Sequence, residues 1–61
     1  MIHCEAIVRE KLLQKNLCDC IKIIGGTPHQ SGNKIWVDYD GRPDKVIALF
    51  EQFSYHTITT K

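Results

Sequence analysis

The sequence predicts one small α+β domain, a two-layer sandwich with the element order helix, strand, strand, helix, strand. With 61 residues, of which 43% are hydrophobic, the chain can form one core and is too short for two. Strong helix formers fill residues 3–16, alternating apolar and polar residues fill 34–40, and apolar residues recur at helical spacing over 43–53. We therefore treat residues 1–61 as a single domain in which two helices cover one face of a three-stranded sheet.

The first predicted element is a helix over residues 3–16. Ile2, Ala6, Leu13 and Leu17 fall within one narrow stripe when successive residues are rotated by about 100°. Asn16 can adopt the left-handed conformation that often ends a helix. These features favour a helix that ends at residue 16.

Two other interpretations of this region stay open. Cys20 and Ile24 extend the same apolar stripe, so a single helix could continue as far as Gly25. Alternatively, apolar and polar residues alternate over 2–8, which suits a strand followed by a helix from Arg9. In that case the order becomes βαββαβ, the ferredoxin-like arrangement.

A hairpin is predicted in the middle of the chain. Residues 20–24 are short, β-branched and stopped by two glycines, which is typical of a strand. Residues 27–33 form a polar loop, and residues 34–40 show the clearest strand alternation in the chain.

A helix and a strand complete the predicted order. Pro43 suits the first turn of a helix and Asp44 its positive end, and the apolar face continues to about Phe53. Residues 55–60 are rich in β-branched side chains and predict a last strand. A right-handed crossover should make this strand parallel to the strand at 34–40, either beside it or one strand away.

Charge and hydropathy exclude several classes of protein. Eight Lys and Arg residues balance seven Asp and Glu residues, and no basic or acidic run favours nucleic acid or a membrane surface. The apolar runs are far shorter than the roughly 18 residues of a membrane span. Residues 1–5 contain an acid where a signal peptide would carry a cation, so we expect a cytoplasmic protein.

The sequence contains possible metal ligands, but their spacing is poor. Cys18 and Cys20 are separated by one residue, whereas zinc knuckles generally separate their ligands by two to four. We expect no metal and no cofactor, and we interpret the cysteines as small, partly buried hydrophobic residues. A zinc or thiol protein remains a third hypothesis, with ligands drawn from His3, Cys4, Cys18, Cys20, His29 and His56.

No motif in the sequence predicts an enzyme. Residues 25–28 lack the Lys-Ser/Thr ending of a phosphate-binding loop, and a pairing of a Cys nucleophile with a His base would require a spatial proximity that the sequence does not supply. The alternation at 34–40 instead singles out Trp36, because Ile35 and Val37 should face the helices and leave Trp36 on the open side of the sheet. A second interpretation is that Trp36 covers the aliphatic stems of Lys22 and Lys34.

These observations favour a small non-enzymatic binding module that regulates or inhibits a macromolecular partner by protein contact. The partner is another protein or a second copy in a homodimer, met through an exposed sheet face and its edges. The predicted contact residues are Trp36, Lys34, Asp38, Lys22 and Tyr55.

A nucleic-acid-binding regulator is the alternative. It would use the aromatic rings of the sheet face or a winged-helix-like hairpin. It is less favoured because Asp38 and Asp40 share the face that carries Trp36 and Lys34.

Overall fold

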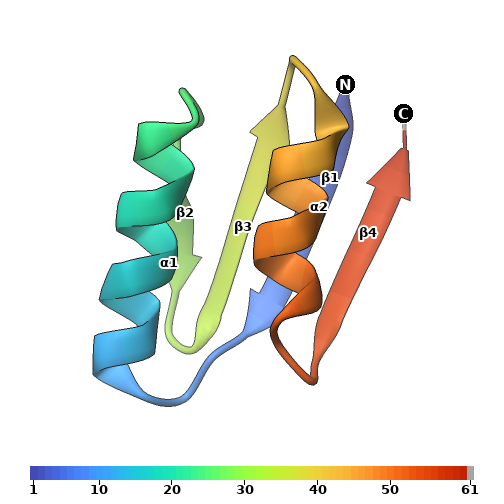
Figure 1. The fold of residues 1–61 in the computed structure, drawn as a ribbon. Coiled ribbons are helices and arrows are strands. Elements are labelled where there is room, and N and C mark those ends of the chain that lie inside the picture. Colours follow the sequence, from blue (N-terminus) through green and yellow to red (C-terminus); the bar gives the residue numbers. More distant parts are fainter. Residues whose placement is uncertain (61) are drawn as a thin grey trace.

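A computed structural model describes residues 1–60, which form four strands of one sheet and two helices (Figure 1). The four strands form an antiparallel sheet in the order β2-β3-β1-β4, and both helices lie on the same face of it (Figure 1). The elements are β1 (Ile2–Ile7), α1 (Lys11–Ile23), β2 (His29–Ser31), β3 (Lys34–Tyr39), α2 (Pro43–Glu51) and β4 (His56–Thr60).

The predicted class, a small two-layer α+β sandwich, is confirmed, and the element order is that of the alternative interpretation. The chain runs βαββαβ, the ferredoxin-like arrangement. The preferred order, helix, strand, strand, helix, strand with three strands in the sheet, is wrong at its first element and at its hairpin.

The first error concerns residues 2–7, which form a strand and not the start of a helix. Ile2, Cys4 and Ala6 are buried, while the residues between them face the other side of the sheet. β1 is hydrogen-bonded to β3 on one side and to β4 on the other. Two ladders and a buried face outweigh the helix propensity of single residues such as Glu5 and Ala6, which is worth only tenths of a kcal/mol each.

The second error concerns residues 20–24, which belong to α1 and do not form a strand. Leu17 and Ile21 are buried one helical turn apart, so the apolar stripe continues past Asn16, as the longer-helix interpretation expects. The helix ends where Gly25, with φ of 89°, and Gly26 donate backbone hydrogen bonds to the carbonyls of Lys22 and Ile21.

The hairpin is formed by β2 and β3, so the predicted loop at 27–33 contains a short strand. Ser31 pairs with Lys34 across a turn in which Gly32 has φ of 61°. Gln14 of α1 fixes the hairpin to the helix layer. Its Nε2 donates to the carbonyl of Val8 at 2.6 Å, and its Oε1 accepts from Gln30 Nε2 at 2.9 Å.

The second half of the chain follows the prediction closely. Pro43 opens α2 and Asp44 lies in its first turn, although the helix ends at Glu51, two residues earlier than Phe53. β1 lies between β3 and β4 and is antiparallel to both, so β4 is parallel to β3 and one strand away. The predicted orientation of the last strand, parallel to the strand at 34–40 and one strand away, is therefore confirmed.

The core fills the space between the sheet and the helices. Phe50 and Val46 of α2 and Ile21 of α1 are fully buried against β1 and β3. Among residues 1–60, the buried core residues are Ile2, Cys4, Ala6, Val8, Leu17, Ile21, Ile35, Val37, Val46 and Phe50.

We expect the close approach of Gly26 to the core to make Gly26→Ala destabilising. The backbone of Gly26 does not need a positive φ, so the substitution alone would stabilise the chain by reducing the entropy of the unfolded state. However, the new Cβ would lie 2.8 Å from Cγ2 of the fully buried Ile21. Overcrowding of this kind costs about 1–3 kcal/mol, measurable by urea unfolding.

The exposed neighbour Thr27 offers a matched control. Thr27→Ala should leave the free energy of unfolding within about 0.5 kcal/mol of the wild type. A Gly26→Ala protein as stable as the wild type would contradict the close packing of residue 26 on α1.

Candidate functional site

The face of the sheet away from the helices carries a group of charged and aromatic side chains that contact one another. We call it the open face. The register places His3 opposite Asp38, Glu5 opposite Trp36 and Ile7 opposite Lys34, so the side chains of each pair share this side. It comprises His3, Glu5 and Ile7 of β1, Lys34, Trp36 and Asp38 of β3, His29 and Ser31 of β2, and Thr57 and Thr59 of β4.

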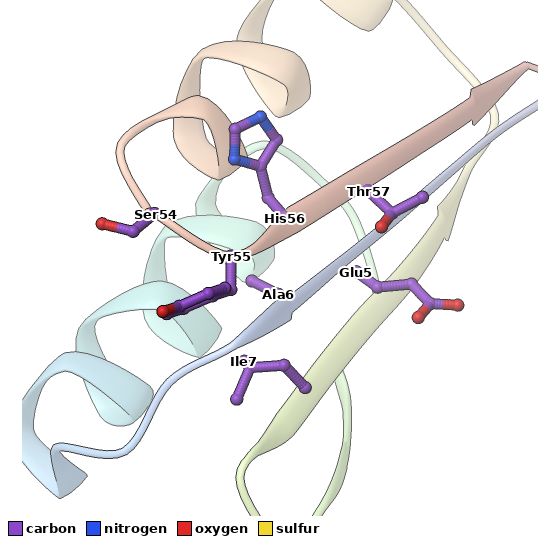
Figure 2. Close-up of a pocket in the computed structure, with 7 residues that line it drawn as sticks. All are labelled: Glu5, Ala6, Ile7, Ser54, Tyr55, His56 and Thr57. Carbon is purple, nitrogen blue, oxygen red and sulfur yellow. The ribbon is translucent and has the colours of Figure 1, made fainter.

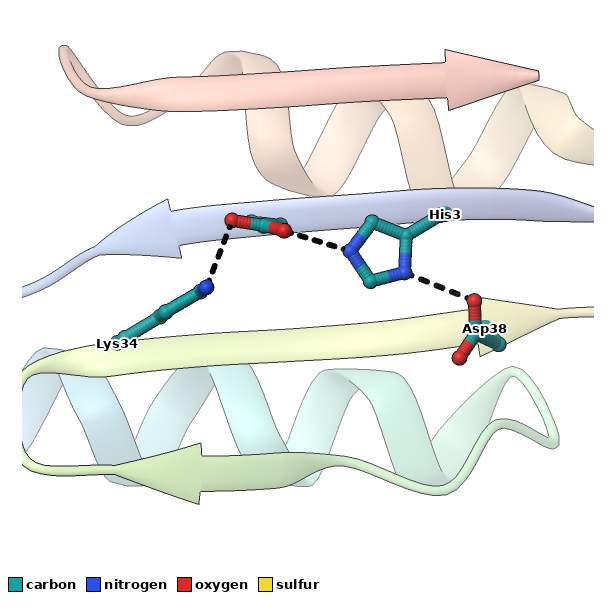
Figure 3. Close-up of polar contacts among 4 residues, drawn as sticks. His3, Lys34 and Asp38 are labelled. Atoms are coloured by element: carbon teal, nitrogen blue, oxygen red, sulfur yellow. Dashed lines mark hydrogen bonds and ion pairs between the residues drawn. The ribbon is translucent and has the colours of Figure 1, made fainter. Parts of the chain in front are cut away.

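Four of these side chains form a row of alternating charge, which we call the ionic row (Figure 3). His3 Nδ1 lies 2.8 Å from Asp38 Oδ1, and His3 Nε2 lies 2.8 Å from Glu5 Oε1. The second Glu5 oxygen, Oε2, lies 3.2 Å from Lys34 Nζ. The row therefore crosses between β1 and β3 and links the two central strands on the solvent side.

The geometry of the ionic row favours a protonated His3. A carboxylate only accepts hydrogen bonds, so both ring nitrogens can donate only when the ring is an imidazolium. The hydrogen bond to Glu5, followed by the one to Asp38, raises the pKa of His3 above its ordinary value. The hydrogen bonds from His3 and Lys34 lower the pKa of Glu5.

Trp36 lies half-buried beside the ionic row and is held by two neighbours on its own face. The imidazole of His29, its cross-strand partner, stacks on the indole with the ring centroids 5.6 Å apart and the planes 21° from parallel. Lys34 Nζ lies 5.6 Å from the centroid of the indole, a distance at which a cation is attracted to the ring. These contacts limit the number of orientations that the indole can adopt.

The structure brings three of the five predicted contact residues together and separates two. Trp36, Lys34 and Asp38 share the open face. Lys22 lies in the last turn of α1, on the helix side of the sheet, because residues 20–24 are helical. Lys22 therefore does not contribute its stem to the surroundings of Trp36, whereas the ammonium of Lys34 does.

Tyr55, the fifth predicted residue, lies at the entrance to β4 and is 71% exposed. Its carbonyl accepts a hydrogen bond from the backbone N–H of Ile7. Together with Ser54 and His56 it lines a shallow hollow of about 260 Å³ at the end of β1 (Figure 2). The ring of His56 is held by the backbone, because its Nδ1 forms a hydrogen bond with the carbonyl of Phe53 at 2.6 Å.

The possible metal ligands are dispersed through the fold. Cys4 is buried in the core, where desolvation raises the pKa of its thiol, and His3 is held by carboxylates in the ionic row. Cys18 and Cys20 are two residues apart on α1 and so point in different directions. Within residues 1–60, no three His, Cys, Asp or Glu side chains gather closely enough to bind a metal ion.

Sequence reasoning missed His3 and Glu5 as members of the site. The predicted helix over residues 3–16 includes both residues and does not place them on the same face of the sheet as Trp36. The signal that reveals them is the alternation of residues 2–8, because a strand in that register places the two polar side chains on the face opposite Cys4 and Ala6.

No protein-family model, no curated protein and no solved structure matches this chain. In addition, neither of the helices in the described part of the chain is long and apolar enough to cross a membrane.

We expect the stability of the protein to fall as the pH rises from mildly acidic to mildly alkaline. The pKa of His3 is raised in the folded state, so its contribution is complete below the ordinary value of 6.5 and is lost as the pH rises through the folded pKa. The pKa of Glu5 is lowered, so its contribution is present above the ordinary value of 4.5 and is lost as the pH falls through the folded pKa. The ionic row is therefore most stabilising between these two values.

Urea unfolding at a series of pH values, with an NMR titration of the His3 ring, tests this expectation. His3→Gln removes the titrating group, so the variant should lose less stability than the wild type between about pH 6 and pH 8. An equal loss in both proteins, or a His3 ring that titrates below its ordinary value, would show that the ionic row is not formed in solution.

Proposed function

We propose that this protein is a non-enzymatic binding module that regulates another protein by covering part of its surface with the open face. The observation that supports the proposal most directly is the position of Trp36, which is half-buried, braced by His29 and Lys34, and directed away from the helices. Tryptophan is among the residues most enriched at the energetic centres of protein interfaces.

The contacts that restrain the indole of Trp36 also favour binding through this residue. Binding costs free energy for every side chain that must be ordered, and an indole stacked in the free protein has already lost much of its rotational freedom. His29 and Lys34 therefore prepare the ring for contact. The outer part of the indole remains accessible, since the residue is not fully buried.

The charges of the open face favour a protein surface with little net charge as the partner. The ionic row pairs the carboxylates of Glu5 and Asp38 with the cations of His3 and Lys34. Because these charges compensate one another while His3 is protonated, the open face attracts phosphate only weakly. An apolar or aromatic patch on the partner, able to pack on Trp36, matches such a face better.

The cytoplasm is the compartment that we propose for this interaction. Cys4, Cys18 and Cys20 are free thiols in the structure, and thiols persist in a reducing compartment. A regulator of this size would act by occlusion, since binding through one face blocks whatever surface of the partner it covers.

We expect Trp36→Ala to weaken binding of the partner by about 30-fold or more, which corresponds to about 2 kcal/mol at an interface centre. Tagged wild-type protein, Trp36→Ala and Leu12→Ala would be incubated with nuclease-treated native lysate, and the retained proteins identified by mass spectrometry. Leu12 is an apolar residue that is 70% exposed on α1, so Leu12→Ala controls for general loss of apolar surface on the other side of the molecule.

The expected result is a partner protein that is retained by the wild type and by Leu12→Ala and is lost with Trp36→Ala. Trp36→Thr, which keeps a β-branched residue in β3, replaces the alanine variant if circular dichroism shows that the latter is unfolded. Retention that is insensitive to both Trp36 variants would remove the open face from the proposal.

Labelled single-stranded and double-stranded DNA, together with labelled RNA, provide the test against the alternative function. We expect no measurable binding at low salt, because cations and carboxylates alternate along the ionic row. An affinity that is high at low salt and falls steeply with added salt would instead identify the protein as a nucleic-acid-binding regulator.

A further inference from the structure

We propose that the outer edge of β4 pairs with β4 of a second copy of this chain, so that two sheets join across a two-fold axis at Ile58. This pairing involves the backbone groups at the edge of the sheet and does not depend on the open face or on Trp36. It follows from the direction of the backbone groups, the composition of the strand and its self-complementary register.

The backbone of β4 directs alternate residues toward β1 and toward solvent. Ile7 N–H donates to the carbonyl of Tyr55, so Tyr55 is a residue whose backbone groups face β1. In an antiparallel ladder both groups of one residue point to the same side and the next residue points to the other. Thr57 and Thr59 therefore bond to β1, whereas His56, Ile58 and Thr60 direct their N–H and C=O groups to the outer edge.

Residues 56–60 lack several of the features by which edge strands avoid pairing. The strand has no proline, no lysine and no carboxylate, and its ladder with β1 runs from His56 to Thr60 without a bulge. The opposite edge of the sheet is different, because β2 has only three residues and its Gln30 side chain is bonded to Gln14 and to the backbone of Gly32. β4 is therefore the longer and more receptive edge.

The register of β4 is compatible with itself about a two-fold axis. Antiparallel pairing centred on Ile58 places Ile58 opposite its own copy and His56 opposite Thr60, so that outward-facing groups meet outward-facing groups. Each of these pairs exchanges two backbone hydrogen bonds. Between them, Thr57 lies opposite Thr59 of the second copy, and no pair brings like charges together.

The two faces of the joined sheet also match. A two-fold axis perpendicular to the sheet keeps the helices of both copies on the same side. Ile58 is half-buried, packs against the core and lies on the helix side with Cys4, its partner in β1. The second copy would cover the remaining exposed part of this side chain with an identical one, whereas a peptide of arbitrary sequence would not supply that match.

Paired charges at positions 57 and 59 test the inference, because these residues are exposed and meet across the axis. The mass of the wild type should rise from one chain toward two across a concentration series that reaches the millimolar range, measured by sedimentation equilibrium. T57K/T59K and T57E/T59E should each remain at the mass of one chain, since like charges then face each other. An equimolar mixture of the two variants should recover the mass of two chains, because every facing pair becomes Lys with Glu.

Recovery in the mixture also shows that both variants are folded. A wild type that keeps the mass of one chain throughout the series, or double variants that associate as strongly as the wild type, would overturn the inference. Trp36→Ala should associate as the wild type does. If Trp36→Ala no longer captures the partner but still self-associates, the proposed function and the pairing of β4 depend on different surfaces. The failure of one proposal can therefore be distinguished from the failure of the other.

Discussion

The structure depends on the position of β1 at the centre of the sheet, with β3 on one side and β4 on the other. Residues 2–6 of this strand each have two cross-strand neighbours, and their side chains alternate between the two faces of the sheet. Cys4 and Ala6 complete the core beneath the helices, while His3 and Glu5 form half of the ionic row. A shift of β1 by one residue would exchange these two sets and place charged groups in the core, so burial fixes the register of the whole sheet.

The parts of the fold that were predictable from sequence are those in which local preference and tertiary environment agree. Apolar and polar residues alternate strictly along β3, and Pro43 with Asp44 marks the start of α2. The predicted bounds of both elements are therefore close to the observed ones. Residues 2–7 contain helix formers as well as a strand-like alternation, and the ladders to distant strands decide in favour of the strand. Ile21 and Ile23 are β-branched and favour a strand locally, yet Ile21 completes a helical stripe that begins earlier in α1.

Only part of the candidate site is predictable from sequence, for the same reason. Trp36, Lys34 and Asp38 come from a single strand, and a period of two places them on one side without knowledge of the fold. His3 and Glu5 join them through pairs that span more than 30 residues of sequence, and no local pattern records such a pairing. Lys22 does not join them, because residues 20–23 are helical and Lys22 therefore lies on the helix side of the sheet.

The pairing of Ile2 with Thr60 has a consequence for how the chain acquires its structure. Within this domain β1 is synthesised before β4, although β4 is one of its two neighbours in the sheet. Contacts between distant parts of a chain carry a large loop-closure entropy and slow folding, relative to contacts between neighbours. Until residues 56–60 emerge, β1 presents an unpaired side to its surroundings, so a stalled or truncated chain exposes the most apolar strand of the sheet to aggregation or to a chaperone.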